Sequence, residues 1–264
     1  MIRVRCLFIL FIVCITCGCG IHSYSPPLTY IPVIPNKGDL NIATSVGISG
    51  FNANLGYALG NHVGVAVAGH AGAANNDEDR DIGEISGYYS GNINETYNAG
   101  VIIGGGMGYE NAKDRKVRQS ISLGKTSDTQ IVDADIKYNH FFAAPYFSHA
   151  FQNGRGSLSF ALRFTIINYS TYNINYDFEN AYDNIYIKDY YSYSLSNYIG
   201  YVIEPTLKWT IGGERLRFLS QIALPFSSLN HSKIREDKKR VDDPAAPSVQ
   251  FGVTYKFPFG ENGR

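Results

Sequence analysis

The stretch YSYSLSNYIGYVIEPTLKW, residues 191–209, decides the fold of this chain. Its odd positions carry tyrosine, leucine, isoleucine and tryptophan, interrupted by Asn197 and Pro205, whereas most even positions are small or polar. A period of two is typical of a β-strand with one apolar and one polar face, and here it holds for about twice the usual strand length. Aromatic residues stand at both ends of the apolar face. A strand that crosses a bilayer, with lipid outside and a polar interior, has this pattern.

The same alternation recurs along most of the chain, between turns rich in glycine and asparagine. It predicts an all-β fold, namely an antiparallel up-and-down transmembrane β-barrel of about ten strands. Eight strands are the alternative, because the strand expected around residues 119–125 is weak. An even number of strands leaves both ends of the chain on the same side. The expected strands cover residues 40–48, 51–59, 63–68, 97–109, 119–125, 130–151, 158–178, 191–209, 216–226 and 249–259.

Two long loops are expected between these strands, at residues 73–95 and 229–247. The first contains the acidic run 76–81, whose alternate aspartates invite a calcium interpretation. Ile82 and Tyr88 stand where a helix-loop-helix calcium loop needs glycine and glutamate, so a solvated loop is the better interpretation. No metal site is predicted.

The polarity of the two faces decides between a membrane barrel, apolar outside, and a soluble barrel or sandwich, apolar inside. The polar face is rich in glycine, alanine, serine and asparagine, which fit a narrow lumen better than a solvated surface. Near Phe141 both parities become apolar, which predicts a bulge or a change of environment. The last strand, VQFGVTYKFPF at residues 249–259, is aromatic.

With this strand, residues 37–264 resemble a small outer-membrane β-barrel protein of Gram-negative bacteria, similar in layout to the OmpX/OmpA-type barrels but longer. The resemblance implies an outer-membrane location, contact with outer-membrane lipid and a monomer. A lipid-tethered soluble β-barrel that binds a small ligand is an alternative. Basic and acidic residues are both 23 in number, so no net charge points to nucleic acid.

The first residues are predicted to direct export. Arg3 and Arg5 precede an apolar run too short to span a bilayer, so residues 1–18 read as a signal peptide. The sequence TCGC at residues 16–19 resembles a bacterial lipobox, which implies lipidation at Cys19. Residues 19–36 are then a lipid-anchored, proline-rich linker, and residues 37–264 form the barrel.

Charged side chains on the polar parity are expected to fill the lumen. Arg163 and Glu204 should lie at similar heights on neighbouring strands and form an ion pair, since an unpaired charge is costly in a confined interior. These charges form either a structural plug, which is the preferred interpretation, or a selectivity ring in a narrow pore. The predicted lumen charges are Arg163, Glu204, Lys208, Arg217 and Lys256.

The hairpin that begins at residue 158 keeps its parity past one membrane thickness, so its tip is expected to project into water. Tyrosines and asparagines concentrate there and could hold a sugar or a protein. The alternative is that tyrosine simply suits an exposed strand. The tyrosines singled out for binding are Tyr172, Tyr176, Tyr182 and Tyr186.

Enzymatic signatures of outer-membrane barrels are absent from the sequence. No histidine forms the Asp-x-His of omptin proteases or the His-x-Ser of outer-membrane phospholipases, and His70 and His140 are expected to line the interior. No nucleophile with an adjacent base is identifiable, and no cofactor is expected. The prediction is a non-enzymatic outer-membrane barrel with a structural or adhesive role, and a narrow passive pore is the alternative.

Overall fold

The computed structural model of this 264-residue chain describes residues 27–33, 35–47, 50–72, 78–121, 125–151, 155–182, 185–227 and 248–258. The predicted signal peptide, Cys19 and the predicted loop 229–247 lie outside the described residues. Within the described part, no helix is long and apolar enough to span a membrane.

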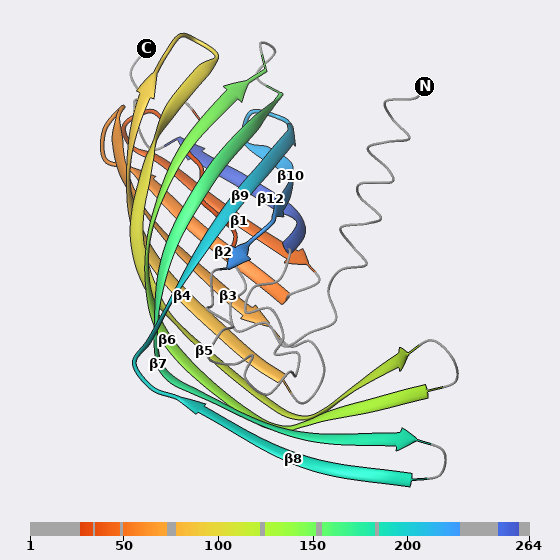
Figure 1. The fold of residues 1–264 in the computed structure, drawn as a ribbon. Coiled ribbons are helices and arrows are strands. Elements are labelled where there is room, and N and C mark those ends of the chain that lie inside the picture. The colour runs from red at the N-terminus through yellow and green to blue at the C-terminus, as the bar shows by residue number, and fades with distance from the viewer. Residues whose placement is uncertain are drawn as a thin grey trace.

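The described chain is built from antiparallel strands (Figure 1). They are β1 Asp39–Gly47, β2 Gly50–Ala58, β3 Val63–Gly72, β4 Glu78–Asn92, β5 Tyr97–Ile121, β6 Lys125–Ala150, β7 Gly156–Tyr182, β8 Ile185–Leu195, β9 Tyr198–Gly212, β10 Leu216–Ala223, β11 Phe226–Ser227 and β12 Ser248–Pro258. Strands β1 to β7, β9, β10 and β12 form a ring, which closes where β12 pairs with β1. The prediction of a closed antiparallel barrel of about ten strands is confirmed.

Strand β4 corrects the predicted loop at residues 73–95, because it occupies most of that range. Its exposed residues include Asp81, Gly83 and Gly87, which interrupt the hydrophobic alternation on the outer face. The strand is defined instead by its backbone pairing with β3 on one side and β5 on the other. Such pairing leaves no mark in a single sequence.

The separate strand predicted around residues 119–125 is wrong as well. Residues 119–121 are the end of β5, which runs without interruption from Tyr97, and β6 begins at Lys125. The basic residues Lys113, Arg115, Lys116 and Arg118 also lie within β5. The missed strand β4 and the false strand at 119–125 cancel in the count. The predicted number of strands is therefore right, although two of the assignments are wrong.

The apolar parity faces outward and the polar parity faces the lumen, as the sequence predicts. On β7, Phe160 is 48% exposed, whereas Ala161 and Arg163 are buried. On β9, Trp209 is 49% exposed, and its neighbour Lys208 is buried. An apolar outer surface around a polar interior is the arrangement of transmembrane β-barrels.

Both parities of β6 are apolar near Phe141 because each faces an apolar environment. Phe141 itself is exposed on the outer face. Phe142 points inward and belongs to a buried cluster that includes Tyr30, from the segment before β1. The pairing of β6 with β7 also shifts register between Lys137 and Tyr138, close to the predicted bulge.

Strands β5, β6 and β7 extend past the ring and, together with β8, bend away from it as a sheet, which we call the projecting sheet (Figure 1). Strand β4 pairs with β5 only as far as Ala112, and β8 pairs with residues 172–182 of β7. Strand β9 takes over the pairing with β7 after Asn197, whose φ of 55° marks the break between β8 and β9. The long hairpin predicted from residue 158 therefore does extend beyond the barrel.

A closed ring of ten paired strands is expected to resist SDS at room temperature. The unboiled protein should therefore migrate at a different apparent mass from the boiled protein in the same gel, because the compact barrel binds less detergent than the unfolded chain. The measurement is a single gel of the membrane fraction. Identical mobility before and after boiling would argue against a detergent-resistant barrel.

Candidate functional site: the lumen

The lumen is lined by the inward parity of the ring strands and is strongly polar. Three layers follow one another along the lumen from the mouth, where β1 begins and β12 ends. A mouth cavity comes first, the segment of residues 27–33 occupies the middle, and charged and aromatic residues lie beyond. The buried polar lining includes Ser45, Asn52, Asn54, Ser148, Ser159, Thr165, Thr206 and Gln250.

The mouth cavity has a volume of about 90 Å³ and a basic lining. Lys208, Arg217 and Lys256, three of the predicted lumen charges, lie together here with Arg215. Lys256 Nζ lies 2.6 Å from an Asp39 carboxylate oxygen. Lys208 is almost fully buried, and its Nζ donates a hydrogen bond to the Thr29 carbonyl.

The middle of the lumen is occupied by residues 27–33, which we call the inner segment. Residues 27–32 are buried. The segment contacts opposite parts of the wall, since Leu28 bonds to Asn52 and Asn54 of β2, whereas the carbonyl of Thr29 accepts from Lys208 of β9. Part of the predicted lipid-anchored linker, residues 19–36, thus lies inside the barrel.

Two side chains anchor the inner segment. Leu28 is fully buried against Ala43 and Leu219, from β1 and β10. The ring of Tyr30 lies 5.6 Å from that of Tyr88, centre to centre. The inner segment is thus held inside the lumen by side chains on several strands.

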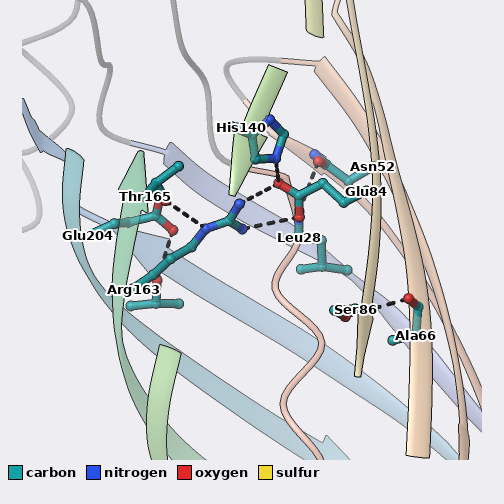
Figure 2. A network of polar contacts seen from close by, with 10 residues as sticks. Leu28, Asn52, Ala66, Glu84, Ser86, His140, Arg163, Thr165 and Glu204 are labelled. Carbon is teal, nitrogen blue, oxygen red and sulfur yellow. Dashed lines mark hydrogen bonds and ion pairs between the residues drawn. The ribbon is translucent and has the colours of Figure 1, made fainter. Parts of the chain in front are cut away.

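Beyond the inner segment lies the charge cluster, which we define as Glu84, His140, Arg163 and Glu204 (Figure 2). Arg163 donates from Nη1 and Nη2 to the two carboxylate oxygens of Glu84 on β4. His140 Nε2 lies 2.7 Å from Glu84 Oε1. The Arg163 guanidinium carbon lies 3.7 Å from the centre of the Phe142 ring, within the range of a cation–π interaction.

Arg163 and Glu204 lie opposite each other on β7 and β9, at the same height as predicted. The guanidinium forms its bidentate ion pair with Glu84, and Glu204 Oε1 accepts from the Thr206 hydroxyl at 3.1 Å. The sequence prediction missed Glu84 because it placed this residue in a loop. Glu84 shares its parity with inward-facing Ile82 and Ser86, and this is the weak signal that marks it as a lumen residue.

A third layer lies towards the projecting sheet. Arg80 and Glu110 form a partly buried bidentate pair, with nitrogen–oxygen distances of 2.8 and 3.0 Å. Tyr138, Tyr169 and Tyr172 pack beside each other, the last two with ring centres 5.4 Å apart. The ion pair and the rings narrow the passage from the projecting-sheet side.

Tyr172 corrects the predicted binding surface, because it is buried within this aromatic group and not displayed on the hairpin. The inward residues of β7 are odd-numbered from Arg163 to Tyr169. A bulge beside Ser170 then reverses the faces of β7, so the even-numbered Tyr172 points inward. For Tyr176, Tyr182 and Tyr186 the structure describes the strand positions alone.

Both interior histidines are where the sequence predicts them. His140 belongs to the charge cluster, and His70 Nδ1 lies 3.0 Å from Asn52 Oδ1. Among the described residues, no group of three or more histidine, cysteine, aspartate or glutamate side chains is placed to hold a metal ion.

Comparisons with known proteins return structures and no family. No protein-family model matches the chain, and no curated protein matches it. One similar structure is the KdgM porin in complex with disordered oligogalacturonate, 12% identical over 83% of this chain and 99% of that chain, with a TM-score of 0.33. A second KdgM porin structure is 12% identical with the same coverage and a TM-score of 0.29. The CymD monoaromatic hydrocarbon channel is 9% identical over 87% of this chain and 90% of that chain, with a TM-score of 0.30.

These similarities concern the fold alone. None of the three structures supports the more specific OmpX/OmpA-type layout or a lipoprotein signal, and both stay predictions. The transmembrane character of the barrel follows from its own faces, which are apolar outside and polar inside.

Proposed function

We propose that this protein is a passive channel of the bacterial outer membrane for small hydrophilic solutes. This puts the narrow pore, the alternative from the sequence, ahead of a structural or adhesive role. The proposed location in the outer membrane rests on the closed β-barrel with its apolar outer face, since β-strands can span a membrane only as a closed barrel. Enzymatic activity is not part of the proposal.

One observation carries the proposal: the middle of the lumen is filled by a segment that precedes the first strand, and not by the wall itself. Residues 27–32 are buried but belong to no strand. A barrel whose role is only structural can fill its lumen with wall side chains, as small barrels do. Because a separate segment fills the middle of the lumen, the wall side chains alone do not fill it, and removal of the segment would leave a passage.

The mouth cavity supports a preference for anions. Its lining contains four basic residues, Lys208, Arg215, Arg217 and Lys256, and two acidic ones, Asp39 and Glu214. Rings of charge in a narrow passage favour ions of opposite sign. We propose small anionic solutes as the preferred cargo.

Electrical recording in planar bilayers tests this function. In a KCl gradient, the full chain and a variant without residues 27–33 are expected to show discrete openings. Their reversal potential should be shifted from zero towards the equilibrium potential of chloride. The double variant Lys208→Gln/Arg217→Gln should move the reversal potential towards zero, because it removes two of the four mouth cations. Lys137→Gln, an exposed site on β6, is the control and should change nothing.

If neither the full chain nor the shortened variant conducts, although gel mobility shows folded barrels, the channel is excluded. The structural role then becomes the better interpretation. Lipidation of Cys19 and the monomeric state stay predictions. Adhesion through the projecting hairpin is the second candidate, supported by the extension of β7 and β8 beyond the ring.

A further inference from the structure

We infer that the lumen wall carries a built binding site for an extended peptide, occupied by the chain's own residues 27–33, and that the channel opens when this segment leaves. The inference rests on the proposed function for its consequence, but the binding site itself can be tested separately. Three features of the wall carry it: an asparagine clamp, a glycine cradle and hydrogen bonds from the opposite wall.

The asparagine clamp recognises main chain. Asn52 and Asn54 stand two residues apart on the lumen face of β2 and are buried. Asn52 Oδ1 accepts from the Leu28 N–H at 3.1 Å, and Asn54 Nδ2 donates to the Leu28 carbonyl, also at 3.1 Å. His70 Nδ1 lies 3.0 Å from Asn52 Oδ1, so its N–H tautomer would hold the amide with the oxygen as acceptor. The two asparagines thus bind both backbone groups, N–H and C=O, of one residue of the segment.

The glycine cradle fits one aromatic ring. Gly56 follows Asn54 on the same face of β2, and a Cβ built there would come within 2.3 Å of the Tyr30 ring. The wall therefore approaches Tyr30 as closely as only glycine allows. The Tyr30 hydroxyl also accepts a hydrogen bond from Asn41 Nδ2 at 3.3 Å.

The opposite wall completes the site with two weaker bonds. Lys208 Nζ donates to the Thr29 carbonyl and Ser148 Oγ to the Pro32 carbonyl, each at 3.4 Å. Pro27 and Pro32 have no N–H group, so the segment brings fewer donors into the lumen that need partners.

The contacts of the inner segment are of a kind that allows reversible binding. The inner segment is held by hydrogen bonds to individual side chains, whereas each wall strand is bonded to its neighbours along a ladder. Asn52 Nδ2 and Asn54 Oδ1 have no hydrogen-bond partner among the described residues. Once the segment has left, these two groups can form hydrogen bonds with water in the open lumen.

The test supplies the segment as a separate peptide. The probe is the synthetic peptide PLTYIPV, which has the sequence of residues 27–33, and the receptor is the chain without these residues. The labelled peptide should bind the shortened chain in detergent micelles saturably, as measured by fluorescence anisotropy, and should bind the full chain at least about tenfold more weakly because its site is occupied. In planar bilayers the unlabelled peptide should block the openings of the shortened chain.

Two wall variants sharpen the result. In the shortened chain, Gly56→Ala and Asn54→Asp should each weaken peptide binding by about tenfold or more, the first by steric conflict with the ring and the second by replacing a donor with an acceptor. In the full chain they should raise the open fraction. Gly83→Ala is the matched control, because a Cβ there meets nothing within 4 Å.

The outcomes separate the inference from the proposed function. Absence of saturable binding, equal binding to the full and shortened chains, or binding unaffected by both Gly56→Ala and Asn54→Asp overturns the inference, even if the barrel conducts. Specific binding to a shortened chain that folds but never conducts supports the peptide site and removes the channel. Equal open fractions of the full and shortened chains overturn gating by this segment.

Discussion

Replacing Arg163 with methionine is expected to lower the free energy of unfolding by about 3 kcal/mol or more. The guanidinium bonds both carboxylate oxygens of Glu84 in the buried charge cluster, and Glu204 lies opposite it on the next strand. Without Arg163, the buried carboxyl groups of Glu84 and Glu204 share a confined space, and Glu84 keeps its contact with His140 Nε2. Breaking a buried pair by removing one partner is costly because the other charge is left uncompensated.

Urea unfolding of the barrel in lipid vesicles, followed by the fluorescence of Trp209, measures this effect, since the chain has one tryptophan and it lies on the outer face. The double variant Glu84→Gln/Arg163→Met is the control. It should lose clearly less stability than Arg163→Met alone, because it removes the buried charge together with its partner. A loss below about 1 kcal/mol for Arg163→Met would mean that the pair is solvated and contributes as little as a surface ion pair.

Placing an arginine in the middle of the outer face is the second change with a large expected effect. Ile203 lies near the centre of β9, is 45% exposed and has Phe164 and Phe226 as cross-strand neighbours. Ile203→Arg should destabilise the barrel in vesicles by about 2–4 kcal/mol, because the charge would lie near the bilayer midplane.

Ile211→Arg is the matched control, since Ile211 is also exposed on β9 but stands at the mouth end of the strand. It should cost about 0–1 kcal/mol, as expected near an interface. Unfolding in urea from vesicles gives both values. If the two variants cost the same small amount, the outer face is in contact with water, and the lipid-tethered soluble barrel becomes the better interpretation.

The strands were predictable to different degrees. The stretch 191–209, expected as one strand, is divided between β8 and β9 at Asn197. Its β9 part, residues 199–209, carries its own signal, because the outward residues are apolar and the inward ones, except Val202, are small, polar or charged. β4 was not predictable in this way, since aspartate and glycine replace apolar residues on its outer face and only its neighbours define it. The missed strand concealed Glu84, and with it the buried ion pair with Arg163.

The inner segment shows the same limit more strongly. Its sequence, PLTYIPV, has prolines and no sustained period, which is typical of a linker. Its burial depends on asparagines and a glycine of β2 and on Lys208 of β9, which come together only when the ring closes. The apolar inward face of β6 near Phe142 was the one trace of it in the sequence.

The sequence by itself determined the all-β fold and the inward and outward faces of most strands, because a period of two places every second side chain on the same side of a sheet. The tertiary structure alone decided which charges pair and what fills the lumen. Those contacts cross the barrel between residues far apart in the chain, such as Glu84 with Arg163 and Thr29 with Lys208. Their geometry exists only after the strands have found their neighbours and the ring has closed.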